Sequence, residues 1–133
     1  MQEMPYGIGT TLDLSPAEAE ERVTAALAAE GFGVLTEIDV TATMKQKLDV
    51  EVPPYRILGA CNPTLAHAAL QADRDIGLLL PCNIVVYESE AGTVVAAMEP
   101  NLMAQMSDSP ELAEIAADAR ARLVRVIKSL AGE

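Results

Sequence analysis

The chain has 133 residues, a size typical of one folded unit, with 50% hydrophobic residues, 22% charged residues and a formal net charge of -11. The negative charge and the 3% aromatic content argue against a nucleic-acid-binding protein. The longest apolar stretch, Ile76 to Tyr87, is interrupted by Pro81 and is too short to span a bilayer, and the N-terminus lacks a secretory pattern. We therefore expect a cytoplasmic protein of one domain, residues 1–133, with free thiols and no membrane or nucleic-acid partner.

The first half of the chain predicts alternating strands and helices. Ser15 is a good N-cap residue and is followed by a proline suited to the first helical turn, and Asp39 can cap a second, shorter helix. The predicted elements are a strand at Gly7–Leu14, a helix at Pro16–Glu30, a strand at Val34–Ile38 and a short helix at Val40–Leu48.

The second half of the sequence predicts another strand followed by a helix, and then a β-hairpin. Asn62 and Pro63 provide an N-cap and a first helical residue, and Ser89 to Gly92 form a turn between two β-branched runs. The predicted elements are a strand at Tyr55–Cys61, a helix at Pro63–Ala72, a buried apolar run at Ile76–Leu80, strands at Asn83–Glu88 and Thr93–Met98, and a long helix from Glu111.

This order of elements predicts the fold class. The order is β-α-β-(short α)-β-α-β-β-α, and the amphipathic helices need a sheet to cover. We expect an α+β fold with a single, mainly antiparallel sheet of about five strands and with helices packed on it.

The middle of the chain resembles a known family. Its motifs are PPYRILGACNP, a helix containing LAHAAL, and IGLLLPCNIVVYE. On these motifs the chain resembles the domain of unknown function 302 family. The resemblance implies a single-sheet α+β fold with helices packed on the sheet, and a homodimer. It implies no reaction, because the family has no accepted catalytic residues.

Two cysteines are the first candidates for a functional site. Cys61 precedes the helix that begins at Asn62, where the helix dipole favours a thiolate, although the favoured interpretation is a small apolar residue at the end of a buried strand. Cys82 also lies near the end of a predicted strand. If the two strands are neighbours, the cysteines could close a disulfide or hold a soft metal such as copper or zinc, with His67 as a third metal candidate.

Three polar residues join the cysteines as candidate ligand-binding residues. Asn62 and Asn83 each follow a cysteine, and for Asn62 the favoured interpretation is a helix cap. His67, the only histidine, lies one turn into the helix that begins near Cys61. A surface or partner-facing position is the favoured interpretation for His67.

Two further patterns are weaker. Met98, Met103 and Met106 could offer thioethers to Cu(I), but flexible packing at a cavity lid or a dimer surface is the favoured interpretation. Glu88 and Glu99 flank the predicted hairpin, and a hydrolase or isomerase acting through them has no supporting motif.

The sequence favours a non-enzymatic, dimeric protein that binds a small ligand or a protein partner. The alternative is a thiol-redox or soft-metal protein that uses Cys61 and Cys82. The sequence identifies no cofactor, and an enzyme is the less favoured class.

Overall fold

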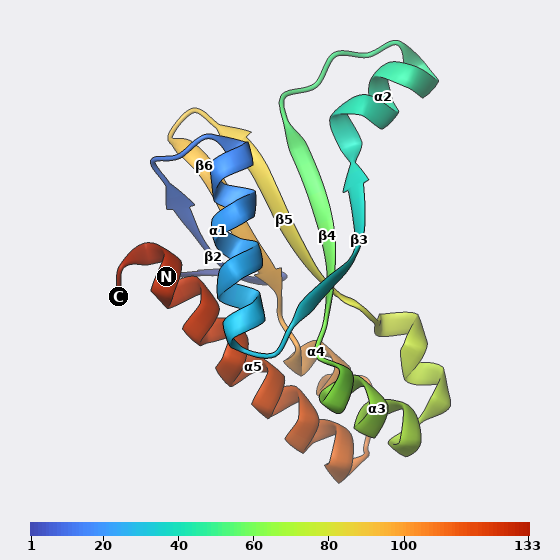
Figure 1. Ribbon diagram of the computed structural model, residues 1–133. Coiled ribbons are helices and arrows are strands. Elements are labelled where there is room, and N and C mark those ends of the chain that lie inside the picture. Colours follow the sequence, from blue (N-terminus) through green and yellow to red (C-terminus); the bar gives the residue numbers. More distant parts are fainter.

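The computed structural model describes residues 1–133 and contains one antiparallel sheet of six strands (Figure 1). The strand order across the sheet is β1-β2-β6-β5-β4-β3, and every neighbouring pair is antiparallel. This arrangement confirms the predicted α+β class with a single sheet and helices packed on it. The strands are β1 (Gln2–Met4), β2 (Gly7–Leu12), β3 (Gly33–Asp39), β4 (Tyr55–Cys61), β5 (Cys82–Ser89) and β6 (Gly92–Met98).

Side-chain caps start the main helices at or within a residue of the positions that the sequence predicts. The side chains of Ser15, Asp39, Asn62 and Ser109 each accept a hydrogen bond from a backbone N–H three residues further on. The helices are α1 (Pro16–Ala29), α2 (Val40–Leu48), α3 (Pro63–Ala72), the 3₁₀ helix η1 (Arg74–Leu79), α4 (Asn101–Gln105) and α5 (Pro110–Ala131). None of these helices combines the length and the apolarity that a bilayer span requires.

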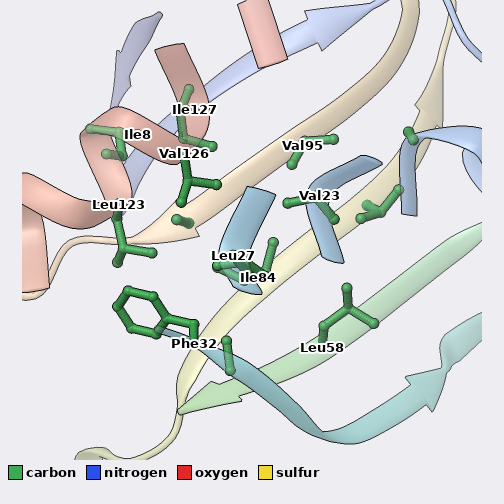
Figure 2. Packing of buried hydrophobic residues seen from close by; sticks show 14 of the residues in the cluster. Ile8, Val23, Leu27, Phe32, Leu58, Ile84, Val95, Leu123, Val126 and Ile127 are labelled. Atoms are coloured by element: carbon green, nitrogen blue, oxygen red, sulfur yellow. The ribbon is translucent and has the colours of Figure 1, made fainter. Parts of the chain in front are cut away.

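The main core lies between one face of the sheet and the helices α1 and α5 (Figure 2). Alternate residues of the central strands point into it, because successive side chains of a strand lie on opposite faces of the sheet. This core contains Val23 and Leu27 from α1 and Leu123 and Ile127 from α5. The buried sheet residues of this core are Ile8, Leu12, Leu58, Ala60, Ile84, Val86, Val95 and Ala97.

A second, smaller core closes one end of the sheet. It joins α3, η1, α4 and α5 through Ala69, Ile76, Met103, Leu112 and Ala116. At this end α3 has its predicted bounds, whereas η1 differs from the sequence prediction. The apolar run from Ile76 to Leu80 forms mainly a 3₁₀ helix in which Ile76 is buried and Leu78 is 89% exposed.

Three further short elements define the edges of the fold. β1 extends the sheet beyond the five expected strands, and α4 forms within the polar stretch after Pro100. At the opposite edge, α2 and the loop to β4 form a projection, residues 40–54, which we call the α2 arm (Figure 1). The Thr41 hydroxyl closes this arm at its base, donating to the Pro53 carbonyl oxygen (2.9 Å) and accepting from the Tyr55 N–H (3.0 Å).

Candidate functional site

The face of the sheet opposite α1 and α5 is also apolar. The side chains that β4, β5 and β6 place on this face include Tyr55 and Ile57, Val85 and Tyr87, and Ala96 and Met98. All six are half-buried. The sheet therefore has two apolar faces, of which only one is covered by the pair of long helices.

A hollow of about 320 Å³ lies on this open face, and we call it the tyrosine hollow. Its volume falls within the range of small-molecule pockets in proteins. All three tyrosines of the chain line it, and no Asp, Glu, Lys, Arg or His side chain does. Its lining consists of Met4, Tyr6, Gly7, Tyr55, Asn83, Val85, Tyr87, Ala96, Ala97, Met98 and Leu102.

A pair of stacked tyrosines forms one side of the hollow. Tyr55 and Tyr87 are direct partners across β4 and β5, so their rings rise side by side from the sheet. The ring centroids are 5.2 Å apart, and the ring planes differ by only 7°. Stacking of this kind restricts both side chains and gives the hollow a fixed aromatic surface.

Glycines on β2 leave the adjoining part of the open face without side chains. A Cβ atom on Gly7 would lie 1.9 Å from the Ala97 carbonyl oxygen, and one on Gly9 would lie 2.9 Å from the Ala96 Cβ. Both distances are too short for a side chain, so β2 approaches β6 closely only because these residues are glycines. The hollow is thus bordered by bare backbone at Gly7, while Tyr6 in the preceding turn is 82% exposed.

The two cysteines lie at the other end of the same strand pair. Ala60 on β4 faces Cys82 on β5, so Cys61 and Cys82 lie near each other, and both line a second hollow of about 30 Å³. This space holds no more than one or two water molecules. Both cysteines are free thiols. Burial, with a smaller contribution from nearby Cys61, raises the pKa of the Cys82 thiol to about 11, so Cys82 is protonated at neutral pH.

The polar candidates fall in three different environments. Asn62 caps α3 by accepting from the Leu65 N–H (3.2 Å), and its amide donates to the Glu30 carbonyl oxygen (3.4 Å), so both ends of the side chain hold the backbone. His67 is exposed on α3 and lines neither of the two hollows. Asn83 is the one polar candidate from the sequence that lines the tyrosine hollow.

The remaining acidic and sulfur candidates are also separated. The Glu99 carboxylate accepts from the Arg120 guanidinium (2.7 Å) and from the Asn101 N–H (3.1 Å), which ties it to the turn before α4. Met98 lines the tyrosine hollow, Met103 is buried in the smaller core, and Met106 is 74% exposed. No three His, Cys, Asp or Glu side chains gather in a group that could hold a metal ion.

The tyrosines were absent from the candidates predicted from the sequence. Tyr55 and Tyr87 are far apart along the chain, and only the register of β4 against β5 brings them together. One signal was available in the sequence: both tyrosines lie in predicted strands, at positions that alternate with apolar core positions, and the chain has only three tyrosines.

The fold and the hollow define a class: an α+β protein with one antiparallel sheet, covered on one face by two helices and hollowed on the other. Within this class, residues 8–130 match the domain of unknown function DUF302, and the chain belongs to that family. This match confirms the resemblance seen in the sequence motifs.

A solved structure supports the assignment. The crystal structure of an uncharacterized conserved DUF302 protein from Bacillus stearothermophilus is 31% identical to this chain and superposes on it with a TM-score of 0.87. The similarity covers 96% of this chain and 99% of the other. None of the curated proteins matches this chain.

The pKa of Cys82 gives a direct prediction for thiol reactivity. Burial is the main cause of the raised pKa and persists in a Cys61→Ser variant. A pKa of about 11 in place of 9.0 leaves about one-hundredth of the usual thiolate at pH 8. We expect alkylation of the folded protein by iodoacetamide to be at least about 100-fold slower than alkylation of the urea-unfolded chain. The rate should rise about tenfold per pH unit toward pH 11. Rapid alkylation of the folded protein at pH 7 would contradict this assignment.

Proposed function

We propose that this protein is a non-enzymatic binding protein, that it takes a small ligand into the tyrosine hollow, and that it works as a homodimer. The single observation that carries the proposal is the tyrosine hollow itself. Its lining combines apolar side chains, a stacked pair of aromatic rings and a few polar atoms. This composition is typical of ligand pockets, in which apolar contact supplies affinity and a few polar groups set orientation.

The lining favours binding over proton transfer. Its polar side chains are the amide of Asn83 and the tyrosine hydroxyls, and it holds no carboxylate–histidine or carboxylate–carboxylate pair. Asn83 can both donate and accept a hydrogen bond. A ligand would therefore be held by contact with the rings and oriented by the amide.

The α2 arm supports the proposal of a dimer. α2 has nine residues and none of them is buried, whereas a helix this short gains little stability by itself and depends on packing. Half of the eight large hydrophobic side chains that are exposed lie on this arm or on the adjoining edge strand: Leu35, Ile38, Leu48 and Val50. Such a concentration of apolar side chains is typical of an interaction surface.

Charge favours a second copy as the partner of the arm. Two chains of net charge -11 repel each other unless they meet through surfaces of low charge. The α2 arm is neutral, because Lys45 and Lys47 balance Asp49 and Glu51. Lys45 is paired with both acids, at 2.6 and 3.0 Å, so three of the four charged side chains of the arm are already bound to one another.

A thiol or soft-metal function is the second candidate. The observation in its favour is that Cys61 and Cys82 line the same small hollow. Against it, metal binding requires thiolates, and the burial that raises the pKa of Cys82 makes its deprotonation unfavourable. Zinc or copper that is retained after purification by the wild type, and lost in Cys61→Ser, would place this candidate first.

The ligand proposal predicts that filling the hollow abolishes binding. A panel of uncharged small aromatic and aliphatic compounds should include members that raise the Tm of the wild type by about 2–8 °C at saturating concentration. Ala96→Phe places a ring inside the hollow and should remove this shift. Ala25→Phe makes the same change on the exposed surface of α1 and should leave it intact. A shift that survives in Ala96→Phe would contradict the proposed site.

The dimer proposal predicts a specific effect of charge on the arm. Leu48 is 67% exposed, so Leu48→Glu should leave the fold intact and weaken dimerisation at least about tenfold in sedimentation equilibrium. Leu78→Glu changes a residue that is 89% exposed on η1 and should leave the dimer unchanged. A wild-type protein that is monomeric at micromolar concentration would contradict the dimer.

A further inference from the structure

Aromatic side chains are scarce in this chain, and most of them line one site. The chain has three tyrosines, one phenylalanine and no tryptophan. Phe32 is buried in the main core, whereas Tyr6, Tyr55 and Tyr87 all line the tyrosine hollow. The faces of such rings carry negative electrostatic potential and attract cations.

The negative charge of the protein disfavours anionic ligands in the tyrosine hollow. The formal net charge is -11, and no Lys, Arg or His side chain lines the hollow. An anionic ligand would enter a negative field without a cationic partner. A cation would be attracted by both the field and the rings.

The lining also discriminates among cations. Small, strongly hydrated cations need carboxylate or carbonyl ligands to replace their water, and no carboxylate lines the hollow. A methylated ammonium group spreads its charge over an apolar surface and is weakly hydrated. Its transfer from water to a site lined by aromatic rings therefore costs little free energy of dehydration. The thioether side chains of Met4 and Met98 add soft, polarizable contacts of the same kind.

We propose that the ligand of the tyrosine hollow is a small organic cation with a methylated ammonium group, held against the tyrosine rings. This inference rests on the proposed ligand-binding function and names the chemical class of the ligand. A volume of about 320 Å³ accommodates such a group together with a short uncharged tail. The Asn83 amide and the tyrosine hydroxyls are the groups that can hydrogen-bond to that tail.

The test compares choline with its uncharged carbon analogue, in which a carbon atom replaces the quaternary nitrogen. The two compounds have nearly the same shape, so isothermal titration calorimetry on the full chain isolates the contribution of the charge. We expect choline to bind at least about tenfold more tightly than the analogue. Equal or tighter binding of the analogue overturns the cation inference and leaves the proposed ligand-binding function standing.

Variants separate the rings from the general negative charge of the protein. Tyr87→Phe keeps an aromatic face and should bind choline within about threefold of the wild type, whereas Tyr87→Leu should weaken binding about tenfold. Ala96→Phe keeps the net charge of -11 and fills the hollow, so it should abolish choline binding. Retained choline binding in Ala96→Phe would overturn the inference, because it would indicate attraction to the charged surface alone. If the wild type binds neither compound at millimolar concentration, the cation inference also fails. The ligand-binding function is then tested separately by the thermal shifts with the panel of uncharged compounds.

Discussion

One constraint underlies the structure: the sheet has two apolar faces, and the pair of long helices covers only one of them. α1 and α5 pack on the face that presents Leu58, Ile84 and Val95. The strands that supply these residues must place their alternate side chains on the opposite face. There the sequence provides Tyr55, Val85, Tyr87, Ala96 and Met98, which remain half-buried and line the tyrosine hollow. The main core and the proposed site are therefore consequences of the same strand alternation.

The pairing of β4 with β5 organises both candidate sites. Near one end of the pair, Tyr55 faces Tyr87, and the rings stack beside an open hollow. Near the other end, Ala60 faces Cys82, and α3 and α5 close over a space that holds one or two waters. The two ends contrast in accessibility: the tyrosine hollow is open enough to receive a ligand, whereas the cysteines are packed into the smaller space. This contrast is the physical reason for ranking ligand binding above thiol chemistry.

Much of the fold could be predicted from the sequence because local signals and tertiary packing agree. The Ser15-Pro16 and Asn62-Pro63 pairs start α1 and α3 as predicted, and the apolar runs at residues 55–61 and 93–98 form interior strands of the sheet. β1 has three residues and only one that is even partly buried, so it carried no periodic signal. The stretch from Ile76 to Leu80 is apolar throughout, yet Leu78 is 89% exposed, because hydrophobicity alone does not specify where a short segment lies.

The site was less predictable than the fold for a related reason. The cysteines and His67 are candidates because of their residue type, which can be read directly from the sequence. The hollow depends instead on strand register, on the absence of a side chain at Gly7, and on rings contributed by separate elements. Of the five residues proposed from the sequence, Asn83 reaches the hollow, and Asn62 holds backbone groups at the start of α3. Cross-strand register is a tertiary property, so residues brought together by it leave little local trace in the sequence.

The most direct test of the central claim, that the open face of the sheet is the binding surface, is an NMR titration of protein with isotopically labelled tyrosine and histidine. All three tyrosines line the hollow, so every labelled tyrosine reports on it, while His67 on α3 serves as an internal control. With choline or a hit from the uncharged panel, we expect the ring signals of Tyr6, Tyr55 and Tyr87 to shift together along one saturable curve, with the His67 signal unchanged. A ligand that shifts His67 and leaves the tyrosine signals in place would contradict the account.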